Sequence, residues 1–118
     1  MIDVLVARVF STRNLVHLHH WKTRSYAQHV TLGEFYDTVI DDVDTLVEAY
    51  QGMYGKINVP FLPKIDLPNS IVKHLENEVV WIIEKRCEIA QDCPTLENLL
   101  DNLSAAYLKV IYKLKNLS

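Results

Sequence analysis

Glycine, proline and cysteine are scarce in this sequence, which has 118 residues but only three glycines, four prolines and two cysteines. Glycine and proline supply most turns, so their scarcity argues against many short strands and favours a few long helices. The cysteines, Cys87 and Cys93, have the spacing of neither a zinc motif nor a disulfide framework. We interpret them as free thiols in a reducing compartment, and therefore expect the protein to be cytoplasmic.

A basic block and a long apolar run are also missing. The net charge is −3, from 12 basic and 15 acidic residues, so no nucleic-acid partner is predicted. The apolar runs are far shorter than the roughly 20 residues of a membrane span, and Asp3 stands where a signal peptide would be basic. Hydrophobic residues form 49% of the chain, which is enough for one core. We therefore expect a single soluble domain over residues 1–118.

Apolar residues recur at steps of three and four in four segments, which predicts helices over about residues 3–24, 25–52, 69–90 and 94–117. Ser25 with Gln28 has the spacing of a capping box, and Pro94 suits a first helical turn. The positions expected to face the core are Leu5, Val6, Val9, Val16, Leu18, Leu32, Phe35, Tyr36, Val39, Val43, Leu46, Val47, Tyr50, Val72, Leu75, Val79, Ile82, Ile83, Leu96, Leu100, Leu103, Tyr107, Val110, Leu114 and Leu117.

The lengths of the connections predict how the helices are arranged. The first two helices are joined almost without a loop, and the last two by the short stretch QDCPT, so each pair should be antiparallel. Between these pairs lies the proline-rich segment GKINVPFLPKIDLPN, residues 55–69. Extended, it reaches up to about 50 Å, whereas the second helix is about 42 Å long. One long crossover between the second and third helices would make an all-α, ferritin-like four-helix bundle.

Two groups of polar residues are candidates for chemistry. The stretch HLHHWKTRSYAQH, residues 17–29, holds four of the five histidines. On the second helix Asp37, Asp41, Asp44 and Glu48 follow one another at steps of four, three and four, so they share one face. Such a stripe is either a solvated face or a cation site, and carboxylate with imidazole suits iron, manganese or zinc.

A metal site built from both groups needs two chains. His29 and Asp44 are 15 residues apart on one helix, which separates their backbones by about 22 Å, whereas ligand bonds are only about 2 Å long. A two-fold axis across the second helix would bring the imidazoles of one copy to the carboxylates of the other. The interface would then hold two equivalent sites per dimer.

The stretch LHHWKTRSYAQHVTLGEFYDTVIDDVDTLVEAY carries a recurring pattern: a His-Trp pair, a second histidine, and an Asp and a Glu four residues apart. With this pattern, roughly residues 9–50 resemble the start of the Dps branch of the ferritin superfamily. The matching residues are His20, Trp21, His29, Asp44 and Glu48, with Tyr36 and Asp37 between them.

This resemblance implies iron oxidation at a site shared across a two-fold dimer interface, with ferric mineral stored inside a hollow dodecamer. It implies that His20 and His29 of one subunit bind iron together with Asp44 and Glu48 of its partner, and that Asp37 is a further metal ligand. It also implies that Trp21 is an oxidisable aromatic beside the metal, where the alternative is an ordinary anchor at the end of a helix.

The sequence departs from the Dps pattern in the metal-binding region. The segment between the two histidines is shorter, Gly33 stands where a second carboxylate is usual, and the DNA-binding lysine-rich tail of some members is missing. These departures favour the alternative of a non-catalytic helical dimer or adaptor that has lost its metal. A third interpretation, an all-α nucleotide pyrophosphohydrolase, requires Glu-x-x-Glu and Glu-x-x-Asp pairs that the acidic residues of the last two helices do not form.

The remaining histidines are assigned to structure. His17 and His20 are three residues apart and can share a face, while His19 points elsewhere. We expect His19 to be exposed or hydrogen-bonded at the end of the first helix. His74 has no arrangement of carboxylates around it in the sequence and is interpreted as structural.

Overall fold

The computed structural model describes residues 1–59 and 68–117, which form four helices. These are α1 (Ile2–Lys22), α2 (Tyr26–Tyr54), α3 (Ile71–Ala90) and α4 (Pro94–Asn116). No strand occurs in the described ranges, so the predicted all-α class is confirmed, and each helix ends within two residues of its predicted limits. In the same ranges, no helix combines the length and the apolar character that crossing a membrane requires.

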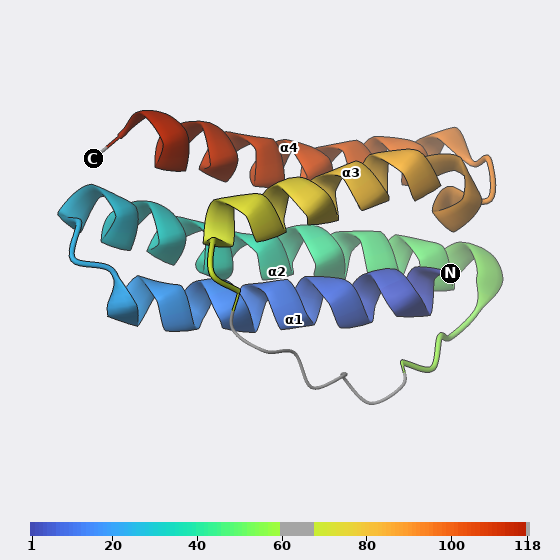
Figure 1. Ribbon diagram of the computed structural model, residues 1–118. Coiled ribbons are helices and arrows are strands. Elements are labelled where there is room, and N and C mark those ends of the chain that lie inside the picture. The colour runs from blue at the N-terminus through green and yellow to red at the C-terminus, as the bar shows by residue number, and fades with distance from the viewer. Residues whose placement is uncertain (60–67, 118) are drawn as a thin grey trace.

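The four helices pack as a bundle that is square in cross-section. Helix α1 packs against α2 and α3, and α4 packs against the same two helices, so α1 and α4 are diagonal to each other, as are α2 and α3. Figure 1 shows that every neighbouring pair is antiparallel and that α2 and α3 run in the same direction. This parallel direction agrees with the length of the connection between them. The predicted crossover itself includes residues 60–67, which lie outside the described residues.

The ends of α2 are set by local hydrogen bonds and backbone conformation. The Ser25 hydroxyl accepts a hydrogen bond from the backbone N–H of Gln28 at 3.2 Å, as the capping box predicts. The Gln28 side chain does not complete the box, because its carbonyl accepts from the Thr23 hydroxyl at 2.9 Å. The helix continues past Gly52 and stops at Gly55, whose φ of 93° is accessible mainly to glycine.

The core is one continuous cluster of apolar side chains from all four helices. Its largest fully buried members are Tyr107, Leu5, Leu32, Leu46, Leu75, Ile82, Ile89, Leu96, Leu100 and Leu103. The prediction of an inward position is wrong for three residues, Leu18, Ile83 and Leu117, whose side chains are 38%, 50% and 47% exposed. Leu18 and Ile83 lie beside the buried stripe of their helices, and Leu117 follows the end of α4.

A buried polar network joins α1, α3 and α4 inside the bundle. Thr12 is fully buried, its hydroxyl lies 3.0 Å from Nε2 of His74, and it also contacts the hydroxyl of Tyr107. Because a hydroxyl both donates and accepts, Thr12 satisfies two polar groups of the interior. The assignment of His74 to a structural role agrees with this network.

An ion pair extends the network between α1 and α3. Nε and Nη2 of Arg8 donate to the two carboxylate oxygens of Glu78 at 3.1 and 2.7 Å, and the guanidinium lies 4.0 Å from the centre of the Trp81 ring.

The prediction that His19 is exposed or hydrogen-bonded is wrong. Its side chain is half-buried, and its Nε2 is buried without a hydrogen-bond partner among the described residues.

These interior histidines predict that the protein loses stability in acid. Burial lowers the pKa of both His74 and His19 below the ordinary value of 6.5, and nearby cations, Arg8 for His74 and Lys22 for His19, act in the same direction, while Glu78 partly opposes the shift of His74. The unfolded chain therefore takes up protons first, so the stabilisation is complete above 6.5 and is lost as the pH falls towards the lowered pKa values.

Urea unfolding followed by circular dichroism measures this effect. The free energy of unfolding of the native protein should decline as the pH falls from about 6.5 to about 5.5. His74→Gln places an amide near the position of Nε2, keeps a partner for Thr12 and cannot titrate, so its decline should be smaller. An equally steep decline in the variant would mean that His74 does not carry the effect.

Candidate functional site at the hairpin of α1 and α2

A tight turn of three residues, 23–25, closes the hairpin of α1 and α2. The backbone N–H of Thr23 donates to the carbonyl of His19 at 2.9 Å, and the Thr23 hydroxyl accepts from the N–H of Ser25 at 3.2 Å. Thr23 therefore links the C-terminal end of α1 to Ser25, the residue that caps α2. The turn places the last turn of α1 directly against the first two turns of α2, which is where the predicted metal-binding histidines lie.

His20 and His29 form a reciprocal pair across this hairpin. Nδ1 of His20 lies 2.5 Å from the backbone carbonyl oxygen of His29, and Nδ1 of His29 lies 2.8 Å from the carbonyl oxygen of His20. The two imidazole rings stack, with their centroids 3.6 Å apart and their planes 21° from parallel. The short turn places the two histidines at the same end of the bundle, and the structure brings them into direct contact.

These hydrogen bonds determine which tautomer each neutral ring adopts. A carbonyl oxygen can only accept, so Nδ1 must carry the proton in each histidine. In the neutral form, Nε2 of each ring then has a free lone pair. Histidines that bind metals show the same arrangement, in which Nδ1–H donates to a carbonyl group and orients the ring. His20 and His29 are therefore prepared as Nε2 ligands before any metal is present.

Gly33 provides the space that the His20 ring occupies. A Cβ atom added at position 33 would lie 3.1 Å from Cε1 and 3.3 Å from Nδ1 of His20, which is closer than ordinary van der Waals contact. From the sequence alone, Gly33 marked a missing carboxylate. In the structure, its lack of a side chain lets the imidazole lie against the backbone of α2.

An aromatic cluster continues from the histidine pair along the outer surface of the hairpin. His17 stacks on Tyr36 with ring centroids 3.9 Å apart, and Tyr36 meets His20 edge-on at 5.2 Å. The Arg13 guanidinium lies 5.1 Å from the Tyr36 ring, and burial together with this cation lowers the pKa of His17. Trp21 packs on His17 at 4.6 Å and is 67% exposed, so it offers an accessible indole beside the cluster.

The predicted carboxylate ligands lie elsewhere on α2. Asp37, Asp44 and Glu48 are all exposed on this helix, and none is paired with the histidines of its own chain. In the part of the chain that the structure describes, no group of three or more His, Cys, Asp or Glu side chains is placed to hold a metal ion. One chain thus supplies two imidazole nitrogens and, separately, an exposed row of carboxylates.

The two imidazoles do not chelate a single ion in their observed positions. A metal lies in the plane of the imidazole that binds it, about 2 Å from the nitrogen. The planes of His20 and His29 are stacked at 3.6 Å and nearly parallel, so they do not meet at one such point. Each Nε2 is therefore a separate ligand, and any ion bound there takes its remaining ligands from outside the pair.

Residues 20–114 match the model of a family of unknown function, DUF5856. The chain belongs to this family. The match begins at His20, and it includes His29, Gly33 and the carboxylates of α2. No curated protein and no solved structure matches the DUF5856 chain significantly.

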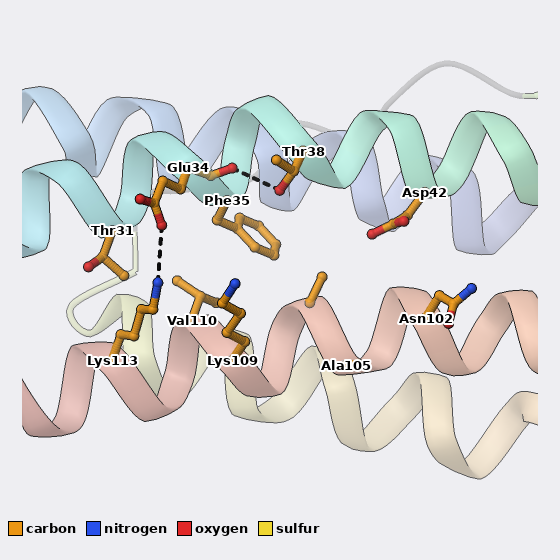
Figure 2. Close-up of a pocket in the computed structure, with 11 residues that line it drawn as sticks. Thr31, Glu34, Phe35, Thr38, Asp42, Asn102, Ala105, Lys109, Val110 and Lys113 are labelled. Atoms are coloured by element: carbon orange, nitrogen blue, oxygen red, sulfur yellow. Dashed lines mark hydrogen bonds and ion pairs between the residues drawn. The ribbon is translucent and has the colours of Figure 1, made fainter.

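The DUF5856 protein also has a groove of about 570 Å³ between α2 and α4 (Figure 2). Lys113 pairs with Glu34 at one end at 3.1 Å, and Asp42 faces Asn102 at the other. Burial and the neighbouring Asp41 raise the pKa of Asp42. No spacing in the sequence predicts this groove, because it depends on Ala105 and Ala106 lying opposite α2, and that register is set by tertiary packing. The groove contains none of the predicted site residues.

Proposed function

We propose that this DUF5856 protein binds iron at a site shared between two copies, as its resemblance to the Dps branch implies. His20 and His29 of one copy supply nitrogen ligands, and Asp44 and Glu48 of the other supply carboxylates. One observation carries the proposal: both histidines donate Nδ1–H to a backbone carbonyl, and neither Nε2 has a hydrogen-bond partner among the residues that the structure describes. This is how proteins prepare imidazoles to bind metals.

The bundle supports the same proposal. Its neighbouring helices are all antiparallel, α2 and α3 run in the same direction, and the 55–69 segment is long enough to return along the bundle. These are the features of a ferritin-like bundle with one long crossover, which we propose as the fold. In such a dimer the hairpins of α1 and α2 face each other, and the exposed carboxylates of one copy complete the ligand set of the other.

The ligand types fit iron chemistry. Carboxylates favour the higher charge of Fe³⁺ over Fe²⁺, and neutral imidazole suits iron, so bound Fe²⁺ is the substrate of a ferroxidase reaction with peroxide or dioxygen as the oxidant. Asp37 lies on the same face of α2 as Asp44 and Glu48, between them and the histidines, and is proposed as a further ligand. Trp21 remains the proposed oxidisable side chain, since it is exposed beside His17.

Asparagine substitutions separate the structural role of the histidines from metal binding. The side-chain amide of asparagine places an N–H donor close to the position of Nδ1 and has nothing at Nε2. His20→Asn with His29→Asn should therefore keep the donors to the backbone and lose the ligands. In anaerobic calorimetric titration with Fe²⁺, the native protein should show saturable binding at about one site per chain, and this variant should show none.

Two further variants complete the titration. Asp44→Asn with Glu48→Gln should also abolish Fe²⁺ binding, whereas Asp41→Asn, an equally exposed position on the same helix, should leave it intact. Circular dichroism checks that every variant keeps its helical content. If both double variants bound Fe²⁺ as well as the native protein does, the proposed site would be wrong.

A second candidate function is a helical interaction module without metal. The observation that favours it is that stacking and the two hydrogen bonds already give His20 and His29 a complete structural role in closing the hairpin. For such a module, Fe²⁺ titration of the native protein should show no saturable binding, and the asparagine variants should differ from it only in stability.

A further inference from the structure

We infer that the outer face of α3 and α4 is an interface with a second copy of this chain, formed around a two-fold axis. This α3–α4 face consists of four exposed apolar side chains, Val80, Ile83, Leu108 and Tyr112, and two ion pairs that flank them. It lies on the opposite side of the bundle from the hairpin of α1 and α2 (Figure 1). The inference goes beyond the proposed iron site and uses none of its residues.

The apolar side chains of the face are at least half exposed. Val80, Ile83 and Leu108 are each 50% exposed, and Tyr112 is 65% exposed. Val80 and Ile83 are three residues apart on α3, and Leu108 and Tyr112 are four apart on α4, so each pair shares one side of its helix. Contiguous apolar surface rimmed by charge is typical of a protein–protein contact rather than of a solvated face.

Two ion pairs set the register of α3 against α4 and enclose this surface. Lys115 pairs with Glu76 at 2.8 Å, and Asp101 pairs with Arg86 through two hydrogen bonds of 2.7 and 2.8 Å. Because the helices are antiparallel, this register places Leu108 beside Val80, between the two ion pairs. Hydrogen bonds from Lys115 and Arg86 lower the pKa of Glu76 and of Asp101, so both carboxylates are ionised near neutral pH.

The four residues of the two ion pairs lie at the corners of the face. Their charges alternate in sign around it, and this makes the face complementary to itself. Along α3, Glu76 is negative and Arg86 positive; along α4, Lys115 lies beside Glu76, and Asp101 beside Arg86. A two-fold axis parallel to the helices places Glu76 of one copy opposite Lys115 of the other, and Arg86 opposite Asp101. An axis perpendicular to the helices places Glu76 opposite Arg86, and Lys115 opposite Asp101. In both cases every charge meets one of opposite sign.

This complementarity identifies the partner as a second copy. A surface with one excess sign would favour a partner of the other sign, but here each sign occurs twice in alternation around an apolar centre. Two-fold contacts between identical surfaces are the commonest form of association between soluble chains. Apolar contact at the centre supplies the affinity, and the ion pairs disfavour arrangements that bring like charges together.

Sedimentation equilibrium of the full chain tests the interface. Ile83→Glu with Leu108→Glu places four carboxylates at the centre of the contact and should reduce the mass of the particle about two-fold or more. Lys115→Glu provides a second variant, because the new carboxylate opposes a negative corner in either orientation. It should also reduce the mass, and it leaves the apolar centre intact.

Met53→Glu is the matched control, since Met53 is 60% exposed and lies on α2, outside the α3–α4 face. It should sediment like the native protein. A native protein with the same mass as the Ile83→Glu, Leu108→Glu variant would overturn the inference. Fe²⁺ titration keeps the two proposals apart: the α3–α4 variants should still bind iron, and the His20→Asn, His29→Asn variant should still assemble through this face.

Discussion

Tyr107→Ala is expected to lower the free energy of unfolding by about 3–5 kcal/mol, a large share of the stability of a small domain. The Tyr107 ring is 1% exposed and packs edge-on against Phe35 from α2, with centroids 5.1 Å apart and planes at 86°. Its hydroxyl contacts Thr12 on α1, which in turn bonds His74 on α3. The substitution therefore leaves a cavity where all four helices meet and also deprives Thr12 of one partner.

Two control variants separate these contributions in urea unfolding. Tyr107→Phe keeps the ring and removes only the hydroxyl, so it should cost about 1 kcal/mol. Tyr26→Ala, at a position that is 81% exposed, should change stability by less than about 0.5 kcal/mol. If Tyr107→Phe were as costly as Tyr107→Ala, the hydrogen-bond network and not the packing of the ring would dominate, which is contrary to this account.

Gly33→Val is expected to destabilise the protein by about 1–3 kcal/mol, because the new side chain overlaps the His20 ring. The ring must turn away, so its hydrogen bond to the carbonyl of His29 and its stacking on the His29 ring are lost together. The effect is also visible in NMR spectra, where the Nδ1–H protons of both histidines should exchange with solvent faster than in the native protein.

Gly52→Val is the matched control for this substitution. Gly52 lies near the end of the same helix, and an added Cβ meets no atom within 4 Å. Since valine is a somewhat better helix former than glycine, this variant should be neutral or slightly more stable. Equal effects of the two substitutions would show that Gly33 has no particular role beneath His20.

The sequence was sufficient to predict the elements that depend on local pattern. Apolar stripes gave the four helices, and Ser25 with Gln28 gave the start of α2. Two of the errors, at Leu18 and Ile83, share a cause, which is that a helix in a bundle buries only one stripe. Leu18 and Ile83 are apolar but lie outside that stripe, and the sequence alone does not reveal how each helix is rotated about its axis.

The candidate site was predictable in part, for a similar reason. The short turn between the first two helices places His20 and His29 near the same end of the bundle, but their direct contact is seen only in the structure. The stacking of His17 on Tyr36 and the function of Gly33 depend on how closely α1 approaches α2, and no spacing in the sequence specifies that distance.

Mixing two inactive variants tests the shared site most directly. One chain carries His20→Asn with His29→Asn and the other Asp44→Asn with Glu48→Gln, so neither should bind Fe²⁺ alone. After the two are unfolded together and refolded, half of the dimers are hybrids, and each hybrid holds one intact site. The account predicts that Fe²⁺ binding returns to about one quarter of the native level. A mixture that binds no more iron than its separate components would contradict it.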